Sequence, residues 1–246
     1  MSGHSKWSSI KRKKAVTDQK RAAAWGKIIR EITVAAKMGG GDPLGNPRLR
    51  LAMDNARAAN MPKDNVDRAI SKGTGDLEGV EYQENSYEAY GPGGVALYVE
   101  TLTDNVNRTV AEVRHALNKQ GGNLGTSGSV AWMFDHRGVI RLDGTRYDEA
   151  TVMEVALDAG ADDMESEDDE LTIYTQVADF QAVQEALRAR KMEWENAELA
   201  MVPKNLVRVE GQDAEKLVKL IEMLEDSDDI QKVYTNADID ESSLEG

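Results

Sequence analysis

The apolar positions of residues 17–38 recur with the period of an α-helix. One side of that helix is apolar, with Trp25, Ile28, Ile29, Ile32, Ala35 and Ala36. The opposite side carries only cations, namely Lys20, Lys27, Arg30 and Lys37. The pattern predicts a two-faced helix that places one wall in a core and leaves the other wall cationic.

Glycine and proline divide the first part of the chain into three helices. Gly39–Gly41 end the first helix, because glycine tolerates the left-handed backbone of a helix C-terminus. Asn46 followed by Pro47 is typical of an N-cap and a first helical position, and predicts a helix to about Asn60. A third helix is expected from Pro62 to Gly73. We therefore expect a small three-helix bundle after a polar, basic arm at residues 1–16.

From about Ser86 onward, β-rich runs alternate with helical segments. Helices are expected at residues 107–119, 152–156, 180–187 and 217–224. Strands are expected at residues 87–90, 95–102, 130–134, 139–142, around 164, and at 171–175, 199–202, 206–209 and 230–234. Residues 137–203 follow the order strand, helix, strand, strand, helix, strand, which is typical of a ferredoxin-like sandwich.

The segments on either side of this sandwich are each too short to cover a sheet. Joined to each other, they would complete a second sandwich around the first. We predict an α+β protein with an N-terminal three-helix domain and two ferredoxin-like α/β sandwich domains, one inserted in the other. The predicted boundaries are residues 1–80 for the arm and helical domain, 81–134 plus 204–240 for the discontinuous domain, and 135–203 for the insert.

Charge is divided unevenly between the two ends of the chain. Residues 1–72 hold sixteen Lys and Arg against six Asp and Glu, whereas the remaining residues hold fourteen against thirty-eight. The local excess is about +10 at the first end, although the formal net charge of the whole chain is −14. A polyanion would bind the basic end despite the acidic mean.

The residue inventory argues against several classes of function. The chain has no cysteine, and His4, His115 and His136 lie in different predicted elements without metal-ligand spacing. We expect no catalytic residues, no metal and no cofactor. An enzyme such as a nuclease stays open as a third hypothesis, beside the two nucleic-acid-binding roles described below. No apolar run approaches the roughly eighteen residues of a membrane span, so we expect an uncleaved, cytoplasmic chain without a membrane partner.

Nucleic-acid binding is the function that the pattern favours. Lysines and arginines grip phosphates, and an aromatic ring can stack on a base. Trp7 could instead plug the helical bundle. A second polar cluster surrounds a helix start, where Asn105 is explained as a cap. The predicted nucleic-acid contacts are Lys6, Trp7, Lys11, Arg12, Lys13, Lys14, Lys20, Arg21, Lys27, Arg30, Lys37, Arg108 and Arg114.

Five ordered motifs along the chain resemble the YebC/PmpR family, which includes the mitochondrial translational activator of cytochrome c oxidase. They are Gly3 to Trp7, Gly39 to Pro43 with Asn46 to Arg48, Tyr90 to Gly94, Asp104 and Asn105 with Asn107 to Arg114, and Gly121 to Gly125. The resemblance implies a three-domain, non-enzymatic regulator of gene expression. Only the basic N-terminal positions and the segment from Asn105 to Thr109 match patterns of functional residues.

Two roles remain open within that resemblance. One is a DNA-binding transcriptional regulator, and the other is a ribosome-associated translation factor that binds ribosomal RNA and eases stalled translation. The predicted helix at residues 17–38 offers mainly lysine, which grips phosphate without distinguishing bases and suits either nucleic acid. The acidic domains are expected to point away from nucleic acid or to contact basic proteins such as ribosomal proteins.

Overall fold

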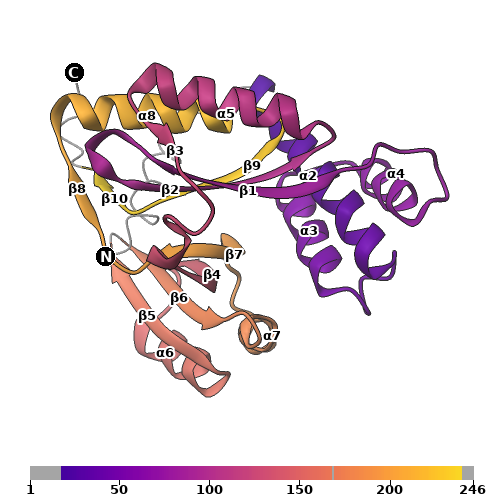
Figure 1. The fold of residues 1–246 in the computed structure, drawn as a ribbon. Helices are drawn as coiled ribbons and strands as arrows, with labels where there is room; N and C mark the ends of the chain where they lie inside the picture. Colours follow the sequence, from indigo (N-terminus) through magenta and orange to yellow (C-terminus); the bar gives the residue numbers. More distant parts are fainter. Residues whose placement is uncertain (1–17, 168, 240–246) are drawn as a thin grey trace. The chain divides into compact units, whose positions relative to one another are not determined.

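The computed structural model describes residues 18–167 and 169–239, with side chains from residue 23 onward. The described chain divides into two compact units (Figure 1). One unit comprises Phe134–Lys204 and the other comprises the described residues on both sides of it. The α+β class and the insertion of one sandwich in the other are confirmed, whereas the three domain boundaries stay a prediction.

The N-terminal bundle consists of α2 (Asp18–Gly39), α3 (Pro47–Ala58) and α4 (Lys63–Thr74). Its core contains the apolar stripe expected from the sequence, with Ile32 and Ala35 packed against Leu49, Ala52 and other buried residues of α3 and α4. Trp25 lies at the edge of this core, and its indole N–H donates to the carbonyl of Ala59 at 3.0 Å. The predicted apolar face of the first helix is thus confirmed.

The expected breaker residues end α2 and begin α3. Gly40 follows α2 with a φ of +82°, which favours glycine. The buried Asn46 caps α3, because its Oδ1 accepts the N–H of Leu49 at 3.0 Å. Its amide group donates to the carbonyls of Ala35 and Gly40, so one side chain joins the end of α2 to the start of α3.

The prediction that α4 ends at Gly73 was wrong. The helix continues through Thr74, and Gly75 provides the left-handed C-cap with a φ of +89°. Gly73 lies inside the helix where α4 crosses α2. A Cβ at residue 73 would clash with the carbonyl oxygen of Thr33 and lie 2.7 Å from the Cβ of Ala36. Close helix packing requires glycine at this position. In a single sequence, a glycine required by packing looks the same as a glycine that ends a helix.

Gly73→Ala is therefore expected to lower the free energy of unfolding by about 1–3 kcal/mol, because overpacking outweighs the gain in helix propensity. Gly26→Ala in α2 is the matched control, since no described atom outside the adjoining backbone of α2 lies within 4 Å of its added Cβ. That control is expected to gain up to about 1 kcal/mol from propensity alone. Urea denaturation followed by circular dichroism measures both changes. A Gly73→Ala protein as stable as the wild type would contradict the packing account.

The first sandwich has a four-stranded antiparallel sheet in the order β3-β1-β2-β9. Its strands are β1 (Gln83–Tyr90), β2 (Ala96–Thr103), β3 (Asn123–Leu124) and β9 (Ile230–Thr235). Helices α5 (Val106–Gln120) and α8 (Gly211–Glu225) lie side by side on one face of the sheet (Figure 1). Two short strands, β8 (Val207–Val209) and β10 (Ala237–Ile239), pair in parallel. Strand β9 follows the inserted unit in the sequence and pairs with β2, which precedes that unit.

The inserted unit has the predicted order of strands and helices. Its strands are β4 (Phe134–Asp143), β5 (Ala161–Glu167), β6 (Glu170–Gln176) and β7 (Asn196–Pro203), arranged as β5-β6-β4-β7. Its helices α6 (Glu149–Asp158) and α7 (Phe180–Ala189) pack together on one face of the sheet (Figure 1). This strand order is that of a ferredoxin-like sandwich. The first sandwich has the same two layers, but its chain begins with the β1–β2 hairpin.

The separate strand expected at residues 130–134 was wrong. Ala131–Met133 form a short 3-10 turn (η2), and β4 begins only at Phe134. The carboxylate of Glu88 accepts the backbone N–H groups of Val130 and Ala131, which draws this segment away from a strand ladder. A distant side chain therefore overrides the local β preference.

Candidate nucleic-acid interface

Most of the basic surplus falls in residues 1–22, which hold seven Lys and Arg and one Asp. The predicted contacts Lys6, Trp7, Lys11, Arg12, Lys13 and Lys14 lie outside the described residues. Lys20 and Arg21 belong to the first turns of α2, but their side chains also lie outside the described part. Their role in nucleic-acid binding stays a prediction.

The cationic face of α2 meets the C-terminal end of α8. The ammonium group of Lys27 donates to the backbone carbonyl of Glu225, the last residue of α8, at 2.6 Å. The last turn of α8 contains no basic residue of its own. Since carbonyl groups at a helix C-terminus carry partial negative charge, Lys27 supplies the cation that this end favours.

Arg30, one turn further along α2, binds Asp229 in the turn between α8 and β9. Its Nη1 atom lies 2.6 Å from Asp229 Oδ1 and also donates to the carbonyl of Leu102 at 3.0 Å. The guanidinium lies over the ring of Tyr82, 5.3 Å from its centroid. Arg30 thus has an anion, a carbonyl and an aromatic face as partners, all from the first sandwich or the segment that leads into it.

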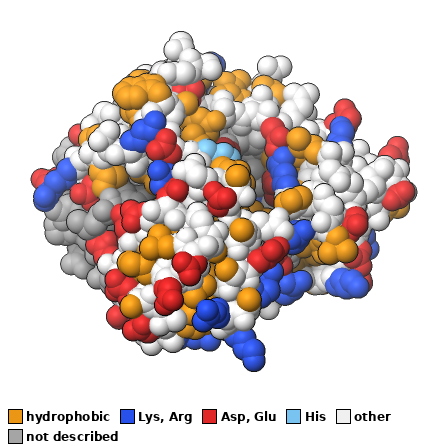
Figure 2. Space-filling model, turned by 90° about the horizontal axis from the view of Figure 1, so that it is seen from below, with side chains coloured by type: hydrophobic (Ala, Val, Ile, Leu, Met, Phe, Trp, Pro, Cys, Tyr) orange, Lys and Arg blue, Asp and Glu red, His pale blue; other side chains and the backbone are white. Residues whose placement is uncertain are grey.

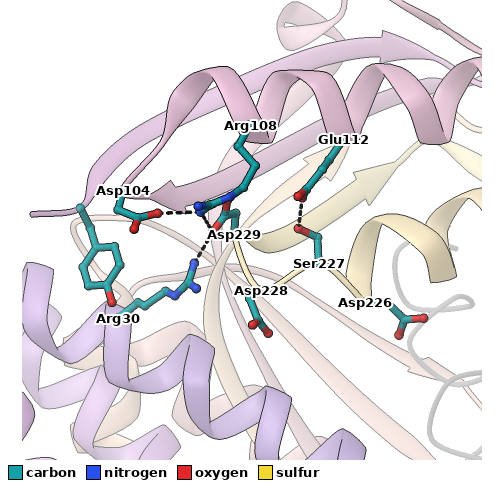
Figure 3. Close-up of a pocket in the computed structure, with 9 residues that line it drawn as sticks. Arg30, Asp104, Arg108, Glu112, Asp226, Ser227, Asp228 and Asp229 are labelled. Carbon is teal, nitrogen blue, oxygen red and sulfur yellow. Dashed lines mark hydrogen bonds and ion pairs between the residues drawn. The ribbon is translucent and has the colours of Figure 1, made fainter. Parts of the chain in front are cut away.

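Arg108 reaches the same carboxylate from α5. Asn105 caps this helix by accepting the N–H of Arg108 at 3.1 Å, which confirms its expected cap role. The Arg108 guanidinium makes hydrogen bonds of 2.7 to 3.1 Å to both oxygens of Asp229 and one of 2.6 Å to Asp104. Figure 3 shows Arg30 and Arg108 converging on Asp229 from two different helices.

Two hydroxyl groups complete the environment of Asp229, whose side chain is 3% exposed. Thr103 and Thr109 donate to its Oδ2 atom at 3.0 and 2.8 Å. Burial alone raises the pKa of Asp229, but the hydrogen bonds from Arg108, Arg30 and both threonines outweigh burial and lower the pKa to about 2. Asp229 is therefore ionised at neutral pH and joins the bundle to the sandwich.

A polar pocket of about 430 Å³ lies at this junction. It is lined by Arg30, Tyr82, Asp104, Arg108, Glu112, Asp226, Ser227, Asp228 and Asp229. Five carboxylates thus face two guanidinium groups, and both guanidinium groups already bind Asp229 (Figure 3). Such a lining repels phosphate, so the junction does not extend the basic surface of the arm.

Lys37 and Arg114 are the more accessible of the predicted contacts with described side chains. Lys37 pairs with Glu81 at 2.7 Å, but both side chains are more than half exposed. A pair of this kind contributes little stability and is easily exchanged for a phosphate. The Arg114 side chain is exposed and makes no hydrogen bond or ion pair with any described residue. Lys27, Arg30 and Arg108 would have to give up internal partners in order to bind phosphate.

The contacts predicted from the sequence did not include three cations of α4. The side chains of Lys63, Arg68 and Lys72 are exposed and, within the described part of the chain, have no hydrogen bond or ion pair. The i,i+4 spacing of Arg68 and Lys72, which places both on one side of a helix, was the sequence signal that indicated them.

On the face drawn in Figure 2, basic side chains lie among acidic side chains and do not form one continuous positively charged surface.

Two family models match the chain in succession. The model described as the TACO1/YebC protein N-terminal domain matches residues 5–76, and the model described as the TACO1/YebC second and third domain matches residues 82–237. The chain belongs to the TACO1/YebC family. The Arg30–Asp229 ion pair therefore joins the family's N-terminal domain to the part that follows it.

Similar proteins of the TACO1/YebC family span nearly the same length. The chain is 55% identical over 245 residues to a "Probable transcriptional regulatory protein" of Chlorobaculum parvum, covering 99% of this chain and 98% of that protein. It is 57% identical over 239 residues to a protein of the same description from Desulforapulum autotrophicum, covering 97% of each. A crystal structure of a conserved hypothetical protein from Aquifex aeolicus superposes with a TM-score of 0.86 at 41% identity, covering 95% of this chain and 96% of that one.

The described residues offer neither a metal site nor a membrane-spanning helix. No group of three or more His, Asp or Glu side chains among them is arranged to hold a metal ion. None of the helices in residues 18–167 and 169–239 combines the length and apolar character of a membrane span.

Proposed function

We propose that this TACO1/YebC protein is a non-enzymatic, cytoplasmic regulator of gene expression that binds nucleic acid, and that it acts as a DNA-binding transcriptional regulator. The observation that carries the proposal is the concentration of seven cations in residues 1–22 of a chain whose net charge is −14. The names of its relatives support a role in transcription. The basic end would supply most of the affinity through phosphate contacts.

The proposed interface has two parts that differ in accessibility. The arm residues Lys6 to Lys14 and the first turns of α2 form the main part. Lys37 and Arg114 add phosphate contacts with little loss of internal interactions, because Lys37 has only an exposed ion pair with Glu81 and Arg114 has no side-chain partner among the described residues. Lys27 and Arg30 serve chiefly to hold the bundle on the sandwich, and Arg108 holds the Asp229 turn against α5 within the sandwich, since the atoms that would bind phosphate already bind the chain.

The second candidate is a translation factor that binds ribosomal RNA through the same basic end. It is favoured by the prevalence of lysine at this end, because lysine binds phosphate as a point charge and does not read bases in the way that bidentate arginine does. The acidic domains of such a factor would face basic ribosomal proteins.

A binding comparison separates the two roles. A DNA-binding regulator is expected to prefer one duplex sequence over random duplex by at least about a thousand-fold at physiological salt. Selection from a random duplex library followed by titration measures that ratio. Equal affinity for all duplexes, together with sedimentation with ribosomes that is lost on raising the salt concentration, would contradict the transcriptional role and favour the ribosomal one.

A further inference from the structure

An uncharged loop carries the most exposed aromatic side chain of the described chain. Residues 121–133 contain no Asp, Glu, Lys or Arg, although 30% of the chain is charged. Trp132 near the end of this loop is 64% exposed, whereas the other described tryptophans, Trp25 and Trp194, are half-buried. Tryptophan side chains are usually buried in large part, so an exposed tryptophan indicates a candidate binding residue.

Buried Glu88 on β1 holds the loop in one conformation. Its carboxylate accepts the N–H groups of Gly128 and Val130 at 2.6 Å and of Ala131 at 2.7 Å. The backbone carbonyl of Glu88 accepts the N–H of Gly125 at 2.7 Å. Burial alone raises the pKa of Glu88, but the three N–H donors lower it, so the carboxylate that organises the loop stays ionised at neutral pH.

The indole ring is oriented by the same loop. Its N–H donates to the carbonyl of Ser129 at 3.1 Å, and the hydroxyl of Tyr90 donates to the same carbonyl at 3.1 Å. The single polar atom of the ring is thus satisfied within the chain. A partner would meet an apolar ring whose supporting backbone is already ordered, which lowers the entropic cost of binding.

The surroundings of Trp132 favour a nucleobase over a protein surface. No other large apolar side chain of the loop is exposed in the described structure, so the loop does not surround the ring with the apolar side chains that protein interfaces use. Exposed Thr126 and Ser127 have hydroxyl groups without a hydrogen bond to any described residue. The loop offers a stacking ring and hydroxyl donors and places no carboxylate of its own beside them.

We propose that Trp132 stacks on an unpaired base of single-stranded nucleic acid, at a site distinct from the basic end. This inference rests on the proposed nucleic-acid-binding function. Stacking of one base on an aromatic side chain typically contributes about 1–3 kcal/mol and tolerates any base, because every base has a π-face. The contact would favour single strands over duplexes, in which the bases are already stacked on one another.

The test compares full-length variants on a labelled single-stranded oligonucleotide and on the matching duplex, by fluorescence anisotropy. Trp132→Leu is expected to weaken single-strand binding by about five- to a hundred-fold, which corresponds to the stacking energy above, and to leave duplex binding unchanged. Trp132→Phe is expected to retain most of the affinity. The matched control is Leu157→Ala, which removes an exposed apolar side chain elsewhere and should change neither affinity.

Intrinsic fluorescence supplies a second measurement. Addition of the unlabelled single strand is expected to quench wild-type tryptophan emission more than that of Trp132→Phe, because a stacked base quenches the indole. Unchanged single-strand affinity of Trp132→Leu, or equal losses on single strand and duplex, would overturn the stacking proposal and leave the proposed function standing. A wild-type protein that binds neither form would overturn the proposed function itself.

Discussion

Asp229→Asn is expected to lower the free energy of unfolding by about 3 kcal/mol, a large effect for one isosteric substitution. The buried carboxylate accepts hydrogen bonds from Arg30, Arg108 and two threonine hydroxyls, and an amide has one oxygen and no charge with which to replace them. Arg30, whose side chain is only 17% exposed, would keep its charge without a carboxylate partner.

The neighbouring Asp228→Asn is the matched control for this substitution. Asp228 is exposed and makes no hydrogen bond or ion pair with the described residues, so its change is expected to stay within about 0.5 kcal/mol. Urea denaturation of both variants at pH 7 measures the difference. Equal stability of the two variants would show that the Asp229 cluster does not hold the bundle on the sandwich.

The same carboxylate gives the stability a pH dependence of defined sign. Its pKa is about 2 in the folded chain, whereas an aspartate in an unfolded chain has a pKa of about 3.9. The unfolded state therefore binds more protons between these values, and the contribution of Asp229 is complete above about pH 4 and is lost as the pH falls towards 2. Wild-type protein should lose stability more steeply than Asp229→Asn across this window.

Reversing the arm charges Lys11, Arg12, Lys13 and Lys14 to Glu is expected to weaken nucleic-acid binding by up to about a thousand-fold at 0.1 M salt, on all sequences alike. Each phosphate contact adds about 0.9 to the slope of log affinity against log salt, so four lost contacts reduce that slope by up to about 3.6. Titration by fluorescence anisotropy at several salt concentrations measures both quantities.

An equal change of charge elsewhere controls for the general effect of making the chain more acidic. Arg190, Lys191, Lys216 and Lys219 are exposed residues of the two sandwiches, and their reversal to Glu changes the net charge by the same amount. This control is expected to keep nearly all of the wild-type salt slope. If both quadruple variants show the same loss, the arm contributes only its share of the overall charge.

The sequence predicted the elements whose periodicity is long and regular, and it missed contacts that depend on distant partners. The apolar stripe through Ile32 and Ala35 and the Asn46 cap are local features, and both were confirmed. The two-residue strand β3 is too short to show a period. The role of Gly73 depends on how α4 crosses α2, which no local pattern reveals.

The candidate site shows the same division between local and distant information. Charge counting identified Arg30 and Arg108 as cations on helices, but their partner Asp229 lies 199 and 121 residues away in the sequence. It stands among several acidic residues, and nothing local distinguishes it from its neighbour Asp228. A cationic helix face therefore does not by itself identify a nucleic-acid interface, because an acidic turn of the same chain can bind its cations.

Nucleic-acid binding through the basic end is tested most directly by crosslinking the protein to nucleic acid with ultraviolet light in cells and mapping the attached peptides by mass spectrometry. We expect crosslinks chiefly within residues 1–37, with a further crosslink at Trp132 when the bound nucleic acid is single-stranded. Crosslinks confined to residues 138–239, with none in the basic end, would contradict this expectation.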